Sequence, residues 1–219
     1  MLLTTVRRGT AAAAVLALSL TLAACGSDDE EATTTGSGSD TETSAAADPS
    51  AQTFGPACDQ VPADGDGSFV GMSDSPVATA AGANPLLQTL VAAVTSVDGL
   101  ADTLNDQPAL TVFAPYEGAF AEIPEADLNG LLDGAKADGN DSALYKILAH
   151  HVLPENDDSD AIVGDHDTLV GDTLTVEGDT DGMTVTDGTV TATVLCGNIP
   201  TANATVYVID KVLTGTDVG

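Results

Sequence analysis

Three cysteines are the side chains of this chain with the clearest potential for chemistry. Cys25 follows Leu22-Ala23-Ala24 at the end of an apolar segment and precedes Gly26-Ser27. This arrangement resembles a bacterial lipobox, in which the cysteine thiol receives a diacylglycerol group and becomes the mature N-terminus. The alternative is an ordinary signal peptide followed by a chance cysteine. The polar tract after Cys25 favours the lipobox, and we predict that Cys25 is the site of lipid attachment.

Cys58 and Cys196 remain once Cys25 is assigned to lipid. A pair of cysteines in an exported protein favours a disulfide, because extracytoplasmic compartments are oxidising. Two unpaired thiols are the alternative, and a count of two free thiols under denaturing, non-reducing conditions would establish it. We predict a Cys58–Cys196 disulfide, which would join the N-terminal segment of the folded part to a late strand.

The chain has three histidines, and two of them are adjacent. His150 and His151 fall in a helix predicted to start at Ser142. Neighbouring residues on a helix point apart, so this pair is poorly placed to bind one metal ion. His151 continues the apolar stripe of the helix, which favours a hydrogen-bonded core histidine over a ligand. His150 is expected on the more solvated side, and His166 in a loop or at a strand edge.

Clusters of acidic residues raise the question of calcium sites, but their spacing does not fit one. Residues 177–182 place carboxylates at alternate positions with glycine sixth, yet an EF-hand loop needs Glu at position twelve, where Gly188 stands. Residues 64–68 fail because Phe69 occupies the required glycine position. The segment 155–160 allows only weak, nonspecific cation binding. We therefore predict no metal centre and no cofactor.

The sequence lacks the usual motifs of catalysis. It contains no G-x-S-x-G nucleophile elbow, P-loop, H-E-x-x-H zinc motif or Rossmann glycine pattern. The cysteines are assigned to lipid and to a disulfide, and the abundant Asp and Ser residues show no spacing that singles out a triad. We predict that the protein is not an enzyme and has no catalytic residues.

The N-terminal part of the chain is predicted to export and tether the rest. Residues 1–24 have the pattern of a lipoprotein signal peptide, with Arg7-Arg8 before an apolar segment too short for a transmembrane helix. Residues 25–53 are predicted to be a disordered linker, rich in acidic residues, Ser, Thr and Gly. Such a linker lifts the domain from the membrane, and its Ser and Thr residues are candidates for O-linked sugars.

The acidic composition limits the classes of partner. The chain contains 34 acidic residues against five Lys and Arg, which gives a formal net charge of −29. This charge repels nucleic acid and anionic lipid headgroups. We therefore expect no nucleic-acid partner, and contact with the membrane only through acyl chains on Cys25. Two explanations of the charge stay open: a solvated acidic surface that keeps the protein soluble, or adaptation to high external salt.

Helices are predicted in the first part of the folded region and strands mostly in the second. Asn84 is a predicted N-cap with Pro85 at the first helical position, and apolar residues recur at helical spacing over 86–97. Other helices are predicted at 75–82, 99–105, 125–132 and 142–152. Strands are predicted at 110–114, 167–170, 173–176, 183–186, 190–195 and 205–209. One strand among helices, followed by a run of strands, indicates an α+β domain.

Three segments together resemble the signature boxes of the fasciclin (FAS1) domain. They are TVFAP with a following GAF at 111–120, ILAHHVL at 147–153, and NATVYVIDKVL at 203–213. The resemblance covers about residues 56–213 and extends to the secreted and lipid-anchored fasciclin proteins of mycobacteria. It implies one fasciclin domain over 54–219, a wedge-shaped β-sandwich with helices packed on it. The motif residues, expected to be mainly structural, are Thr111, Phe113, Pro115, Phe120, His151, Val208 and Asp210.

The sequence departs from the family pattern at two places, and the resemblance also bears on the cysteines. His150 stands where the family usually has Tyr, and Tyr116-Glu117 replace the usual Thr-Asn or Thr-Asp. The similar mycobacterial proteins bridge cysteines at places that match Cys58 and Cys196.

For function, the resemblance implies an exported protein that is lipid-anchored at the outer face of the cell membrane or at the cell surface. It would present one fasciclin domain for cell adhesion or surface interaction, with a surface protein, a glycan or a lipid as its partner. The alternative is a carrier of a small apolar ligand or lipid, bound in a groove lined by the 86–97 helix.

Overall fold

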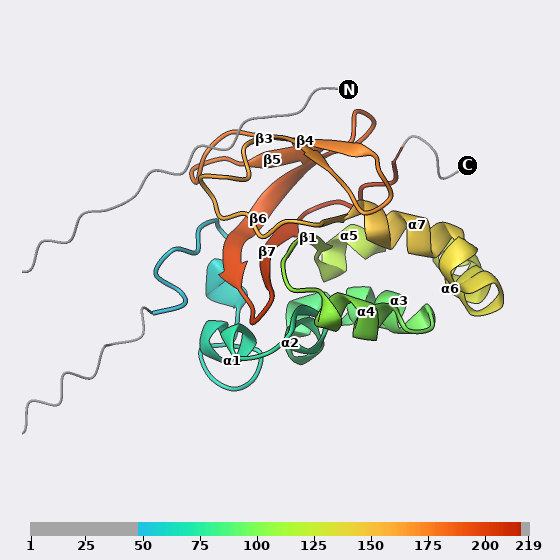
Figure 1. The fold of residues 1–219 in the computed structure, drawn as a ribbon, viewed down its shortest axis with the longest axis horizontal. Coiled ribbons are helices and arrows are strands. Elements are labelled where there is room, and N and C mark those ends of the chain that lie inside the picture. Colours follow the sequence, from blue (N-terminus) through green and yellow to red (C-terminus); the bar gives the residue numbers. More distant parts are fainter. Residues whose placement is uncertain (1–47, 216–219) are drawn as a thin grey trace, which may run out of the picture. The chain divides into compact units, whose positions relative to one another are not determined.

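The computed structural model describes residues 48–215 (Figure 1). The predicted signal peptide at 1–24, the lipid-attachment residue Cys25 and the linker up to residue 47 lie outside the described residues. The last residues of the predicted linker contact the domain, because the side-chain amide of Asn198 donates a hydrogen bond of 3.2 Å to the carbonyl oxygen of Gln52. The folded part of the chain therefore starts before Phe54.

Seven strands form one continuous sheet in the described part of the chain. Their order across the sheet is β2-β1-β7-β6-β5-β4-β3. Their bounds are β1 Leu110–Pro115, β2 Val152–Leu153, β3 Gly164–Asp167, β4 Thr173–Glu177, β5 Thr184–Thr186, β6 Thr191–Pro200 and β7 Ala204–Ile209. β1 runs parallel to β7, with Phe113 opposite Tyr207. The other pairings of these described strands are antiparallel.

Strand β6 connects two halves of the sheet and makes the fold a sandwich. Its first residues, up to Thr193, pair with β5, whereas its residues from Val194 onward pair with β7. Register shifts on both sides of Cys196 mark irregularities of the bulge type, which bend a strand and increase its twist. Asn198 has a positive φ of 57° in this stretch, a conformation that Asn adopts more readily than most residues. The predicted α+β sandwich is confirmed.

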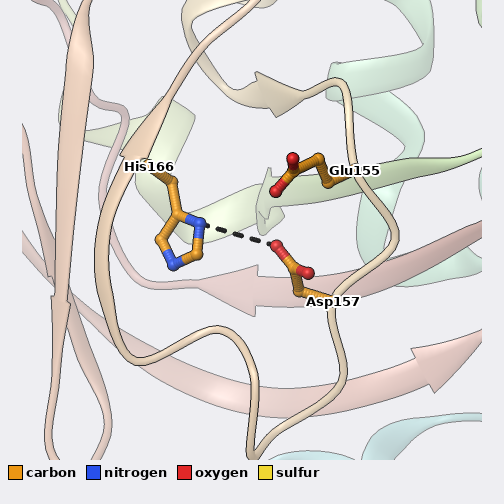
Figure 2. A group of neighbouring side chains, drawn as sticks. All are labelled: Glu155, Asp157 and His166. Atoms are coloured by element: carbon orange, nitrogen blue, oxygen red, sulfur yellow. Dashed lines mark ion pairs between the residues drawn. The ribbon is translucent and has the colours of Figure 1, made fainter. Parts of the chain in front are cut away.

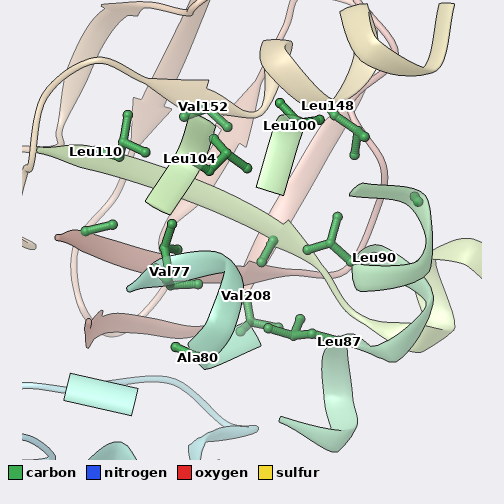
Figure 3. Close-up of a cluster of buried hydrophobic side chains, with 14 of the residues drawn as sticks. Val77, Ala80, Leu87, Leu90, Leu100, Leu104, Leu110, Leu148, Val152 and Val208 are labelled. Carbon is green, nitrogen blue, oxygen red and sulfur yellow. The ribbon is translucent and has the colours of Figure 1, made fainter. Parts of the chain in front are cut away.

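Side chains of β1 and β7 alternate between two hydrophobic cores. The inner core lies between the sheet halves and contains Phe113, Tyr207 and Ile209 with residues of β4, β5 and β6. The ring centroids of Phe113 and Tyr207 lie 5.7 Å apart. The outer core lies between the sheet and the helices and contains Leu110 and Val208 (Figure 3). Because successive side chains on a strand point to opposite faces, both strands are buried on both faces.

The helices pack on the half of the sheet that contains β1 and β7 (Figure 1). The α-helices are α1 Phe69–Ser73, α2 Val77–Ala83, α3 Gln88–Ser96, α4 Leu100–Asp106, α5 Glu117–Ala121, α6 Glu125–Asp138 and α7 Ala143–His150, and the 3-10 helices are η1 Cys58–Gln60, η2 Pro85–Leu87 and η3 Gly139–Asp141. The predicted cap at Asn84 is present, since its side chain accepts a hydrogen bond from the N–H of Leu86 at 3.0 Å. Ser142 caps α7 in the same way, through the N–H of Tyr145. Such caps satisfy N–H groups that the first turn of a helix leaves unpaired.

Several predicted elements differ from the structure. α6 extends beyond the predicted 125–132 to Asp138, and β6 extends beyond the predicted 190–195 to Pro200. The helix predicted through Val152 ends at His150, and Val152 belongs to β2, which pairs with β1. The strand predicted at 167–170 lies earlier, as β3, because a turn begins at Thr168, whose carbonyl oxygen accepts the N–H of Gly171 at 3.0 Å. Gly171 has a φ of +88°, which favours glycine. The turn therefore ends the strand where the apolar residues begin.

Within residues 48–215, no single helix has both the length and the hydropathy of a membrane span. Two consecutive helical segments, Val77–Ala83 and Pro85–Ser96, reach that length and hydropathy only when taken together, and the chain bends by 103° between them.

Candidate functional site

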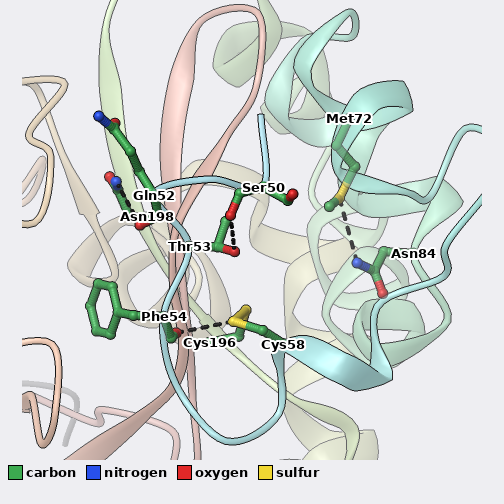
Figure 4. The surroundings of a disulfide bond; sticks show 9 residues. All are labelled: Ser50, Gln52, Thr53, Phe54, Cys58, Met72, Asn84, Cys196 and Asn198. Carbon is green, nitrogen blue, oxygen red and sulfur yellow. Dashed lines mark hydrogen bonds between the residues drawn. A yellow bond between two sulfur atoms is a disulfide. The ribbon is translucent and has the colours of Figure 1, made fainter. Parts of the chain in front are cut away.

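A disulfide joins Cys58 and Cys196 and ties η1 to the bent strand β6 (Figure 4). The two Cα atoms lie 4.9 Å apart. Beside the bridge, the backbones of Phe54 and Gly197 exchange hydrogen bonds of 3.3 and 2.8 Å. A Cβ atom at position 197 would come within 2.4 Å of the Phe54 ring, so a side chain there would force the ring to move. The bridge and this backbone pair together fix the N-terminal segment on β6.

The motif residues of β1 serve the fold. Phe113 is completely buried in the inner core. Thr111 is also completely buried, and its hydroxyl donates to the carbonyl oxygen of Glu155 at 2.8 Å and accepts from the N–H of Asp157 at 2.9 Å. Pro115 lies opposite Ile209 at the end of the parallel ladder. Thr111 therefore positions the loop after β2, Phe113 fills the inner core, and Pro115 lies where the strand ends.

The other motif residues near the helices and β7 are structural as well. Phe120 of α5 and Val208 of β7 are buried in the outer core. Asp210 follows β7, and its Oδ1 accepts the N–H of Thr193 at 2.7 Å while its own N–H donates to the carbonyl oxygen of Thr193 at 3.1 Å. This reciprocal pair holds the end of β7 against β6.

His151 is buried just after α7, and both of its ring nitrogens are hydrogen-bonded. Nδ1 lies 2.7 Å from the carbonyl oxygen of Ile147, and Nε2 accepts the N–H of Leu213 at 3.0 Å. Because a carbonyl only accepts and an N–H only donates, the ring is the neutral tautomer with its hydrogen on Nδ1. Burial lowers the pKa of His151 from 6.5 to about 4. His151 therefore links α7 to the C-terminal segment and has no free nitrogen for a ligand.

His150 is buried, so the prediction that it lies on the solvated side of its helix is wrong. Its Nδ1 lies 3.2 Å from Asp172 Oδ2, and its Nε2 lies 3.7 Å from Asp187 Oδ2. Burial would raise the pKa of Asp187, but hydrogen bonds from backbone N–H groups, led by that of Val190, outweigh burial and lower this pKa. The helix periodicity could not show that loops from the other half of the sheet cover His150.

A cavity of about 90 Å³ lies between the helices and β1, and we call it the apolar groove. Residues of α2, α3, α4 and α7 line most of it, including Val77, Leu90, Val91, Val94, Leu104 and Leu148. Several of these residues also belong to the outer core (Figure 3). Leu169, in the turn after β3, borders the groove and is 42% exposed. Small-molecule sites usually measure about 300–1,000 Å³, so this groove suits a small or partly inserted apolar group.

The loop after β2 and the edge strand β3 bring Glu155, Asp157 and His166 together (Figure 2). We call these three residues the acid–histidine cluster. One potential ligand atom from each residue lies within 4.8 Å of the other two. The strand-edge position predicted for His166 is confirmed, since β3 is the last strand of the sheet. The spacing of the three residues does not reveal the cluster, because an irregular segment separates its members.

Comparisons with known proteins agree with the architecture and the motif segments. The model of the fasciclin domain matches residues 85–215. Cell surface glycolipoprotein MPB83 of Mycobacterium bovis is 38% identical over 177 residues, which cover 78% of this chain and 76% of that protein. Immunogenic protein MPT70 of Mycobacterium tuberculosis is 37% identical over 166 residues, which cover 73% of this chain and 80% of that protein.

Among solved structures, a FAS1 domain pair from the insect cell adhesion molecule fasciclin I matches with a TM-score of 0.46 and 21% identity. The match covers 58% of this chain and 44% of that chain. The family assignment itself rests on the domain model, which matches more than half of the chain, and on the two mycobacterial relatives. The chain belongs to the fasciclin domain family.

Proposed function

We propose that this protein is an exported, lipid-anchored surface protein that presents one fasciclin domain for adhesion or surface interaction, without enzymatic activity. The observation that carries the proposal is the 38% identity over 177 residues to proteins named cell surface glycolipoproteins. The commitment of two cysteines and one histidine to the fold supports a binding role. Cys58 and Cys196 form a disulfide, and both ring nitrogens of His151 are hydrogen-bonded within the core.

The anchor in this proposal is a pair of acyl chains carried by Cys25. Each buried CH₂ group contributes about 0.8 kcal/mol to membrane binding, and stable anchoring takes two chains. A chain with a net charge of −29 gains nothing from an anionic membrane surface, so the acyl chains supply the attachment. The binding partner on the other side is a surface protein, a glycan or a lipid.

The anchor proposal predicts the behaviour of Cys25→Ser. Cells fed a clickable palmitate analogue should label the wild-type chain, and the variant should carry no label because it lacks the thiol that is modified. A strain that lacks the protein should regain cell-to-cell adhesion with the wild-type chain but not with Cys25→Ser. Ser27→Ala is the matched control and should behave as wild type. Label retained on the variant would contradict the anchor, and adhesion unchanged by loss of the whole protein would contradict the adhesion role.

A second candidate function is the carriage of a small apolar ligand, and the apolar groove favours it. The groove is lined mainly by aliphatic side chains of α2, α3, α4 and α7, and the exposed Leu169 borders it. Apolar walls of this kind gain from excluding water, whatever the identity of the apolar group that enters. At about 90 Å³ the groove admits the end of an acyl chain more readily than a whole lipid.

The carrier function predicts a discrete added mass. Native mass spectrometry of the exported chain should show it after exposure to a lipid extract of the host. Val94→Phe should abolish the added mass, because Val94 lines the groove and the larger ring fills it. Val163→Phe is the control, since Val163 is 47% exposed and lies outside the groove lining. Equal uptake by the two variants would place the ligand elsewhere, and no uptake by the wild type would remove this candidate.

A further inference from the structure

We propose that Glu155, Asp157 and His166 bind one Zn²⁺ ion at the edge of the sheet. The ligand atoms of the three side chains lie within 4.8 Å of one another, so small side-chain rotations bring all three onto a single ion (Figure 2). Imidazole nitrogen and carboxylate oxygen are both ordinary zinc ligands. Three protein ligands leave the fourth tetrahedral position for water or for a group from a partner.

The hydrogen bond of His166 aims one ring nitrogen at the carboxylates. Nε2 lies 2.8 Å from the carbonyl oxygen of Ile162, so Nε2 carries a hydrogen and donates it. In the neutral ring, Nδ1 then holds a lone pair, and this nitrogen lies 3.5 Å from Asp157 Oδ2. Two hydrogen-bond acceptors that face each other repel unless a cation lies between them. Metal-binding histidines commonly donate their other N–H to a backbone carbonyl in this way.

Asp157 supplies a second and independent observation. Its Oδ2 atom is buried, and among the described residues it has no hydrogen-bond partner. A buried carboxylate oxygen without a donor is costly, because it has lost its water and gained nothing in exchange. A metal ion bound between Asp157 and His166 would compensate this oxygen.

The distance between the two atoms is compatible with a metal ion between them. Charge-assisted N–H···O bonds are usually about 2.7–2.9 Å long. With zinc bonds of about 2.1 Å to both nitrogen and oxygen at a tetrahedral angle, the nitrogen and oxygen lie about 3.4 Å apart. The observed 3.5 Å between Nδ1 and Oδ2 matches the zinc geometry and exceeds the length of a good hydrogen bond.

The backbone of the site is held in place before any ion binds. The Thr111 hydroxyl contacts the carbonyl oxygen of Glu155 at 2.8 Å and the N–H of Asp157 at 2.9 Å. The Tyr207 hydroxyl donates to the carbonyl oxygen of Asp157 at 3.1 Å. Because Thr111 lies in β1 and Tyr207 in β7, two central strands fix the loop that carries two of the three ligands. A site on such support loses little conformational entropy on binding.

Calcium fits the site less well than zinc. Ca²⁺ takes six to eight oxygen ligands, whereas this cluster offers one nitrogen and two carboxylates. The alternative occupant of the space between Nδ1 and Oδ2 is a proton, which would turn His166 and Asp157 into an ion pair. The two occupants predict different responses to added zinc, and the experiment separates them.

Calorimetric titration of ZnCl₂ into the full-length chain, in a buffer without chelators at pH 7.5, tests the proposal. We expect one saturable site per chain and a rise in Tm with zinc. Glu155→Gln and His166→Gln should each weaken binding about tenfold or more, since loss even of a supporting group commonly costs that much. Glu122→Gln is the matched control, because Glu122 is an exposed acid at the end of α5. This variant should bind zinc with the affinity of the wild type.

The variants keep the test decisive even if one of them fails to fold. His166 holds the carbonyl oxygen of Ile162, so His166→Gln can destabilise the loop, but Glu155 is exposed and its replacement leaves the core untouched. Circular dichroism verifies the fold of each variant. Absence of a one-to-one site, with Tm unchanged by zinc, would overturn the proposal. Equal zinc affinity in folded Glu155→Gln, wild type and control would assign binding to other carboxylates and overturn it too.

Discussion

Reduction of the Cys58–Cys196 disulfide should lower the free energy of unfolding by about 5 kcal/mol. The bridge joins positions 138 residues apart in the sequence. In the chain-entropy model, opening a loop of that length gives the unfolded chain conformational freedom worth about 5 kcal/mol at 25 °C. Many domains are stable by only about 5–15 kcal/mol, so the reduced protein should lie near the lower limit of stability. Urea unfolding with and without reductant measures the difference.

The double variant Cys58→Ser/Cys196→Ser is the control for this measurement. It should be less stable than the reduced wild type and should not respond to reductant. Cys196 is completely buried, so part of the loss in the variant comes from a serine hydroxyl in an apolar site. A difference between oxidised and reduced wild type below about 1 kcal/mol would show that the unfolded chain is already restrained in another way.

Acidification from pH 6.5 to pH 4 should cost the domain about 3 kcal/mol through His151 alone. Burial lowers the pKa of His151 from 6.5 to about 4, so the unfolded chain takes up a proton before the folded one does. The stability from this residue is complete above pH 6.5 and is lost progressively as the pH falls toward 4. Each unit of pKa difference is worth 1.36 kcal/mol, which gives the size of the loss. Chemical unfolding at a series of pH values records it.

Two substitutions separate His151 from the other acid-sensitive groups. His151→Phe should be less stable than wild type at pH 7, because it leaves the buried N–H of Leu213 unpaired. Its free energy of unfolding should no longer show the decrease between pH 6.5 and 4 that His151 causes. His166→Gln should keep that slope. The pKa of Asp187 is lowered, so its contribution to stability is lost as the pH falls below the ordinary pKa of 3.8, which lies outside this pH window. An unchanged slope in His151→Phe would contradict the assignment.

The central elements of the fold were predictable because their signals are local. β1 and β7 are apolar on both faces, and each lies between two cores. Asn84 caps its helix as its side-chain chemistry predicts. The predicted helix extends too far because Val152 fits the helical spacing of apolar residues. In the structure, Val152 instead pairs with Val112 of β1.

The candidate sites depend on contacts between distant segments, and this limits what residue patterns can predict. The disulfide could be predicted because only two cysteines remained for an oxidising compartment. The burial of His150 depends on Asp172 and Asp187, which belong to the other half of the sheet. The acid–histidine cluster likewise needs the turn that places His166 beside Asp157. No periodicity along the chain encodes either contact.

The place of β7 in the sheet has a consequence for how the chain folds during synthesis. β7 lies between β1 and β6, although it is the last strand along the described residues, and its parallel partner β1 was made much earlier. Contacts between segments so far apart form slowly, because a long loop must close first. Neither core can close until Ala204–Ile209 has left the ribosome. The nascent chain should therefore stay open until β7 has been made, which leaves time for a transport machinery to thread it unfolded.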